Sequence, residues 1–174
     1  MKMTLGGRYI RLPHLSARVG ELRNRLSRAR YFRGHGVHSP FVYSVVRQVF
    51  MSHRLLSAET SLRDALVAAG VPERRAMELQ NLMTHCEYRT FAIDEASAEL
   101  CVATRTLPKT ETLRLVQTAC SRGATIAVME PYADRERERM CGAIVAGHGS
   151  TTVDNRGYLL IFNNKYLPKQ HFRI

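Results

Sequence analysis

Residues 124–130, with the sequence ATIAVME, form a nearly continuous apolar run that is followed directly by Pro131. Such a run, bounded by turn residues, is typical of a strand that is buried on both faces of a parallel sheet. Apolar residues at helical spacing predict one helix before it, at 109–121, and another after it, at 133–146. The run therefore predicts the centre of an α/β sheet.

Further strands are predicted on both sides of this centre, at 99–104, 150–154 and 158–163. The alternation of strands with helices predicts that the first two run parallel to 124–130. Asn155-Arg156-Gly157 has the composition of a hairpin turn, so the last strand is expected to be antiparallel. The expected fold class is α/β, with N-terminal helices, a mostly parallel sheet and a C-terminal antiparallel hairpin. The side chains expected in its core are Val102, Leu113, Val116, Ile126, Val128, Ile144, Leu160 and Phe162.

Residues 88–93 also have the composition of a strand, but only residues 94–98 separate them from the next one. A parallel crossover usually needs a dozen residues or more. The sequence therefore predicts either a hairpin between these two strands or no contact between them.

The first half of the chain is predicted to be helical, at 15–32, 40–54, 58–69 and 72–86. Leu15, Val19, Leu22 and Leu26 give the first of these helices one apolar stripe. Ser39 and Pro40 supply the N-cap and first-turn proline of the second.

Positive charge is concentrated at the N-terminus of this 174-residue chain. Residues 1–56 hold eleven of the 26 basic residues and one of the 15 acidic ones. Nearly all of the chain's net charge of +11 therefore comes from this segment. We therefore distinguish a basic helical segment, 1–56, from an α/β domain, 57–174. The basic segment predicts either an arm that meets a polyanion such as RNA or a solvated helix face that keeps the protein in solution.

Other classes of protein are disfavoured. No apolar run approaches the ~20 residues of a membrane span, and the N-terminus lacks the apolar core of a secretory signal, so a cytoplasmic protein is expected. The four cysteines form no C-x-x-C pair, and His35 and His38 have no nearby ligand partners, so neither a disulfide framework nor a metal site is expected.

Two short segments resemble a known family. Residues 34–42, GHGVHSPFV, follow the predicted Arg-rich helix, and residues 169–174, KQHFRI, end the chain. Both are similar to segments of a group of bacterial class I S-adenosylmethionine-dependent methyltransferase-like proteins. The element order over 99–163 is also similar to the second half of that Rossmann-like fold.

The chain departs from this family where the cofactor would bind. Members carry a strand that ends in an acidic residue and a glycine loop, whereas residues 57–87 are predicted to be helical and contain the single glycine Gly70. The predicted strand at 99–104 ends with Thr104 and is followed by Arg105, where members of the family would have an acidic residue. The resemblance thus implies a truncated methyltransferase-like domain without S-adenosylmethionine binding, which acts as a binding module. The alternatives are an active methyltransferase completed by a second copy or another protein, and a basic RNA- or ribosome-associated protein.

Candidate binding residues lie mainly in the basic segment, and no catalytic group can be selected. Arg33, Gly34, Gly36, His38 and Ser39 predict either an anion-binding spot at a helix start or a capped turn. Candidate phosphate contacts on the preceding helix are Arg23, Arg25, Arg28 and Arg30. The basic and aromatic residues of 165–173 predict either RNA stacking or a tail strand that docks Tyr166 and Phe172 on the core. The alternating charges of 134–139 are interpreted as a solvated helix face.

Overall fold

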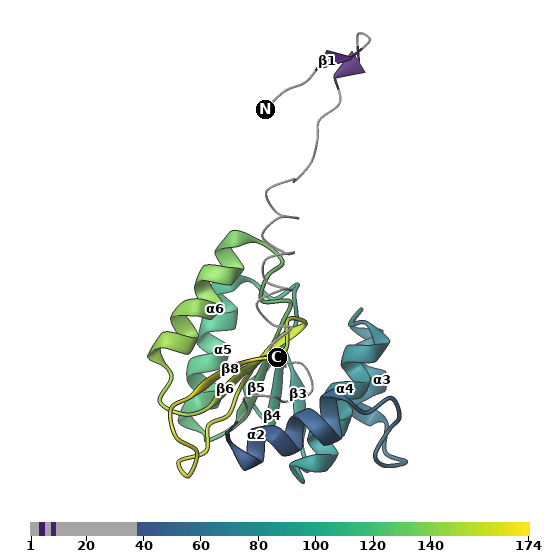
Figure 1. The fold of residues 1–174 in the computed structure, drawn as a ribbon, viewed down its shortest axis with the longest axis vertical. Helices are drawn as coiled ribbons and strands as arrows, with labels where there is room; N and C mark the ends of the chain where they lie inside the picture. Colours follow the sequence, from purple (N-terminus) through teal and green to yellow (C-terminus); the bar gives the residue numbers. More distant parts are fainter. Residues whose placement is uncertain (1–3, 6–7, 10–37) are drawn as a thin grey trace.

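The apolar run at 124–130 forms β5 (Thr125–Met129), near the middle of a six-stranded sheet with the order β3-β4-β5-β7-β6-β8 (Figure 1). The computed structural model describes residues 4–5, 8–9 and 38–174. The other strands of this sheet are β3 (Phe91–Ile93), β4 (Leu100–Ala103), β6 (Thr152–Asp154), β7 (Tyr158–Ile161) and β8 (His171–Arg173). Two short strands, β1 (Thr4–Leu5) and β2 (Arg8–Tyr9), pair with each other in an antiparallel ladder.

Helices cover both faces of the sheet and give the domain three layers (Figure 1). One face carries α5 (Lys109–Ser121) and α6 (Arg135–Gly147). The other carries α2 (Pro40–Val45), the π-helical turn η2 (Val46–Phe50), α3 (Ser61–Ala68) and α4 (Glu73–His85). In the described part of the chain, no helix is both long and apolar enough to cross a membrane.

The predicted strand directions are confirmed. β4 and β5 are parallel, β7 is antiparallel to both β5 and β6, and β6 therefore has the same direction as β5. β8 extends the sheet in parallel beside β6, so the tail strand that the docking alternative predicted at the C-terminus is present. The fold is thus a mixed, Rossmann-like α/β sheet with an antiparallel strand inserted between β5 and β6.

The prediction for the strand before β4 was wrong. β3 pairs with β4 in parallel, with Phe91 opposite Leu100, so the two strands are neither a hairpin nor apart. Only residues 94–99 make the return, which is enough because β3 is about 10 Å long and six extended residues span roughly 20 Å. Asp94 starts the return in a left-handed conformation, with φ 59°, and its N–H donates to the Val102 carbonyl at 2.8 Å.

The two faces of the sheet carry alternate residues of each strand. Val102 and Leu160 pack toward α2, α3 and α4, whereas Ile126 and Val128 pack toward α5 and α6. Phe162 stands edge-on to Phe41 of α2 at 4.9 Å between ring centroids, which ties the segment at 40–50 to the same core. Of the side chains expected in the core, Val102, Val116, Ile126, Val128, Leu160 and Phe162 are buried, and Leu113 and Ile144 are half-buried. On α5, Leu115 is buried more deeply than Leu113, although it was not among the predicted core residues.

Candidate functional site

In open α/β sheets, ligands bind outside the carboxyl ends of the strands. Asp94, which follows β3, accepts hydrogen bonds from the Thr104 N–H and the Thr104 hydroxyl, both at 2.7 Å. Thr104 follows β4, so the contact joins the ends of two neighbouring strands. Both carboxylate oxygens of Asp94 are thus occupied by the chain itself.

A buried arginine spans the next two strands at the same edge. The Arg137 side chain enters from α6, is 7% exposed, and donates to the Met129 carbonyl at 3.0 Å and the Thr104 carbonyl at 2.9 Å. The expectation that 134–139 forms a solvated face is therefore wrong for Arg137, since its guanidinium caps the ends of β4 and β5. Asp134 starts α6 by accepting from the Arg137 N–H at 2.8 Å.

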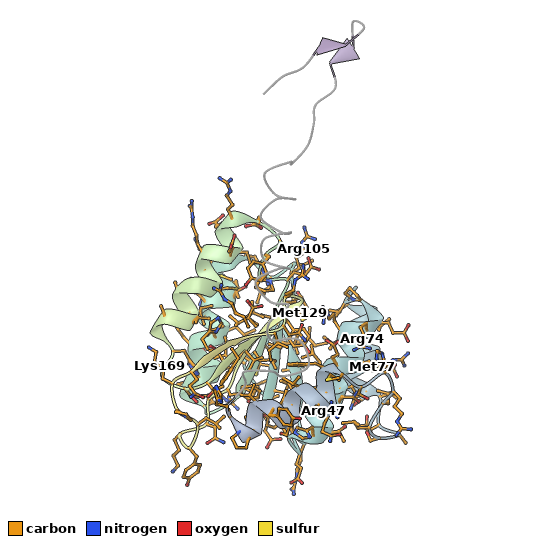
Figure 2. The ribbon with its side chains drawn as sticks, viewed as in Figure 1. Arg47, Arg74, Met77, Arg105, Met129 and Lys169 are labelled. Carbon is orange, nitrogen blue, oxygen red and sulfur yellow. The ribbon has the colours of Figure 1, made fainter. Side chains whose placement is uncertain are left out.

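The outer rim of this edge is closed by an exposed ion pair. Arg105, after β4, donates to Glu130, after β5, at 3.1 Å. Figure 2 shows Arg105 above Met129 at this end of the sheet. Glu130 has a φ of 46°, and its backbone N–H donates to the Gly157 carbonyl. Three successive strand ends are therefore connected to one another by side chains of this protein.

A second polar cluster lies between α4 and the β6–β7 turn, and it was missed at the sequence level. Glu78 is 2% exposed, and its carboxylate accepts from Arg74 at 2.8 Å and Arg75 at 2.7 Å. Asn155 and the Tyr158 hydroxyl donate to the same carboxylate at 3.2 and 3.1 Å. Every donor to the carboxylate is provided by the chain and the carboxylate is buried, so this cluster joins α4 to the β6–β7 turn.

Perturbed acidities are caused mainly by burial. Burial raises the pKa of Cys86 to about 11 and that of Cys141 to about 11, which keeps both thiols protonated near neutrality. Burial and the neighbouring Glu78 carboxylate raise the pKa of Tyr158 well above its ordinary value. These shifts disfavour thiolate or phenolate nucleophiles at neutral pH. Within the described residues, no group of three or more His, Cys, Asp or Glu side chains is placed to hold a metal ion.

The sequence-predicted anion residues are only partly described. Arg23, Arg25, Arg28, Arg30, Arg33, Gly34 and Gly36 lie outside the described residues. Ser39 is the N-cap of α2, and its hydroxyl accepts from the Val42 N–H at 3.4 Å, while His38 is exposed. The N-cap prediction is confirmed for Ser39, whereas the packing that the capped-turn alternative expected for His38 is not found.

The C-terminal segment divides between its two predicted roles. Phe172 packs against the core, as docking predicts. Tyr166 does not dock: its side chain is 82% exposed, with the Lys165 ammonium 5.2 Å from the ring centroid. The loop beneath it is fixed, because Ser150 donates to the Leu167 carbonyl and Thr151 to the Pro168 carbonyl.

No family model, curated protein or solved structure matches this chain in the three comparisons made.

Proposed function

We propose that this protein is a truncated methyltransferase-like domain that does not use S-adenosylmethionine and acts as a binding module. The resemblance of residues 34–42 and 169–174 to the methyltransferase-like group supports the family part of the proposal. The element order from β4 to β7, with its reversed strand, agrees with what that resemblance implies for the second half of the sheet.

The observation that carries the loss of the cofactor is the occupation of the carboxyl edge. Arg137 donates to the carbonyls at the ends of β4 and β5, and each carboxylate oxygen of Asp94 accepts a bond from Thr104. A nucleoside that approached these strand ends would have to break contacts between buried or half-buried groups. Because unsatisfied buried polar groups cost about 1–3 kcal/mol each, this exchange disfavours binding.

Thermal melts with S-adenosylmethionine and S-adenosylhomocysteine test this proposal. A ligand present at 100 times its dissociation constant stabilises the folded state by about 2.7 kcal/mol, which a melt resolves easily. We expect no shift in melting temperature at submillimolar cofactor. A saturable rise would overturn the proposal. Repeating the melt on the protein purified with its native partners tests the alternative of an enzyme completed in trans.

RNA binding is the second candidate, favoured by the charge of residues 1–56 and by the exposed Tyr166. Affinity should then fall steeply with salt, with a slope of about −0.7 per phosphate neutralised on a single strand. Replacing Arg23, Arg25, Arg28 and Arg30 with Gln should flatten that slope by roughly two to three units.

The matched control is a quadruple Arg→Gln variant on the α/β domain, at the exposed positions Arg89, Arg114, Arg122 and Arg139. It removes the same charge and should leave the slope nearly unchanged if the N-terminal arginines carry the contacts. Equal slopes for both variants would indicate a diffuse charge effect and count against a specific basic arm. Tyr166→Ala should weaken binding without changing the melting temperature if the ring stacks on a base.

A further inference from the structure

A pocket with a volume of about 320 Å³ opens between α6 and the β6–β8 end of the sheet. This size lies at the lower end of the range of small-molecule sites. One wall is a face of α6 that includes Glu138, Gly142 and Val145, and the opposite side is formed by Leu159 of β7 and by Arg173 of β8. A Cβ atom added at Gly142 would meet no atom within 4 Å, so the helix surface is open there.

Arg173 is held in this pocket by a chain of polar contacts. Its Nε–H donates to Nε2 of His171 at 3.4 Å, so this ring nitrogen must be the acceptor. The proton of the neutral imidazole then lies on Nδ1, which is 2.8 Å from the Thr152 hydroxyl oxygen. Because Nε is used for positioning, the two terminal nitrogens of the guanidinium remain as a fork. Such a fork matches the two oxygens of a carboxylate.

The other side chains of the pocket define the rest of the ligand. Glu138 is an exposed carboxylate on the α6 wall, and in the described part of the chain no basic side chain forms an ion pair with it. Val145, Leu159 and the ring of Tyr132 add apolar surface. A dianion such as phosphate would be repelled by Glu138 and by Asp154, a second carboxylate in the pocket lining, whereas a ligand with one carboxylate and one ammonium group can pair with Arg173 and Glu138.

We propose that this pocket binds a small zwitterion of the amino-acid class, with its carboxylate on Arg173, its ammonium group toward Glu138 and its apolar side chain against Val145 and Leu159. This inference does not rest on the loss of S-adenosylmethionine binding, because its two charged groups, Arg173 and Glu138, lie on β8 and α6 and not on the strand ends joined by Asp94 and Arg137. Failure of one proposal leaves the other standing.

Nuclear magnetic resonance titration of the full-length chain with L-phenylalanine tests the proposal. For a ligand of about a dozen heavy atoms we expect a dissociation constant in the roughly millimolar to micromolar range. Saturable amide shifts should appear on α6 and β8. Two analogues separate the charges: 2-phenylethylamine lacks the carboxylate, and 3-phenylpropanoate lacks the ammonium group. Each should bind at least threefold more weakly than L-phenylalanine.

Variants and their controls connect the shifts to the pocket. Arg173→Met should weaken binding by about tenfold or more, whereas Arg139→Met, at an exposed site on α6 outside the pocket, should not. Gly142→Leu fills the open space and should abolish binding. Gly147→Leu, at the end of the same helix and equally open, is its control.

Several outcomes would overturn the proposal. The first is the absence of saturable shifts up to 10 mM L-phenylalanine, a concentration chosen as about ten times the weakest affinity expected. The second is equal binding of L-phenylalanine and 3-phenylpropanoate, or of inorganic phosphate, which would indicate a general anion site. The third is unchanged binding in a folded Gly142→Leu variant, which would place the ligand elsewhere.

Discussion

The hydroxyl of Tyr158, at the start of β7, donates a 3.1 Å hydrogen bond to the buried carboxylate of Glu78, eighty residues earlier on α4. Arg75 forms an ion pair with the same carboxylate, and its guanidinium carbon is 5.9 Å from the centroid of the Tyr158 ring. A contact of this sequence separation closes a long loop, so it connects the helical first half of the chain to the hairpin. It is also the contact for which stability is most readily partitioned by mutation.

Replacing Glu78 with Ala should lower the free energy of unfolding by about 2–3 kcal/mol. Removing one partner of a buried ion pair typically costs 3–5 kcal/mol, and the lower value applies here because Arg74 and Arg75 are 40% and 32% exposed. Urea unfolding measures the change. The control Glu111→Ala breaks an exposed i,i+3 pair with Arg114 and should cost under about 1 kcal/mol. Equal costs for the two variants would show that the Glu78 cluster is not a stabilising contact.

Tyr158→Phe should cost about 1 kcal/mol, because Glu78 keeps its other donors when this hydroxyl is removed. The same substitution made in a Glu78→Ala background should behave differently, since no carboxylate is left to accept the bond. The double-mutant cycle therefore predicts a coupling energy of about 0.5–1 kcal/mol or more. Strict additivity of the two substitutions would contradict the contact.

The Glu78 cluster also shows what the sequence could and could not predict. The apolar spacing of Leu79, Leu82 and Met83 correctly predicts α4 and its buried side, because helix periodicity is a local property. Glu78 lies beside this stripe, and its burial depends on Asn155 and Tyr158, which only the folded topology brings near. No local pattern contains that information.

The burial of Arg137 likewise could not be predicted from the sequence around it. Residues 134–139 alternate acid and base, and the pattern favours a solvated face for all of them. One member is nevertheless buried, because α6 crosses the ends of β4 and β5 where carbonyl groups need donors. The strands themselves were predictable from their apolar runs, and the short parallel return between β3 and β4 was not, since it depends on Asp94.

Arg137→Met should destabilise the fold by about 2–3 kcal/mol. It keeps most of the apolar stem but removes two charge-assisted hydrogen bonds and leaves the Met129 and Thr104 carbonyls without this donor. Arg139→Met, on the exposed side of the same helix, should change stability by less than about 0.5 kcal/mol. Denaturant unfolding of both variants measures the difference, and similar values would refute the capping role.

Stability should fall at alkaline pH because of two thiols, the half-buried Cys86 and the buried Cys141. Burial raises the pKa of Cys86 and Cys141 to about 11 from an ordinary value of 9.0, so the folded state holds these protons longer than the unfolded state. The stability that the two protonated thiols contribute is fully present below the pKa of the unfolded state. It is lost as the pH rises toward the pKa of the folded state. Between pH 9 and 10 the loss is about 1 kcal/mol per thiol.

A Cys86→Ala, Cys141→Ala variant tests this account through the slope of stability against pH. The slope between pH 9 and 10 should be shallower than in the parent, although the variant is less stable overall because it loses buried atoms. Cys120→Ala is the control and should change the slope less, because burial raises the pKa of this thiol by a smaller amount. Identical slopes in parent and double variant would exclude the thiols as the cause.

Asp94 should be the position that holds β3 in the sheet. Its φ of 59° is costly for most residues, and its carboxylate accepts two bonds from Thr104. Asp94→Ala loses both acceptors and retains the strained backbone, so we expect a cost of about 2–4 kcal/mol. Asp94→Asn keeps one carbonyl acceptor and tolerates the left-handed region, so it should cost about half as much.

Hydrogen exchange locates the effect: amides of Phe91–Ile93 should lose protection in Asp94→Ala, while those of β5 and β7 keep theirs. Uniform loss of protection across the sheet would mean that β3 unfolds only with the whole domain, and the local role assigned to Asp94 would be wrong.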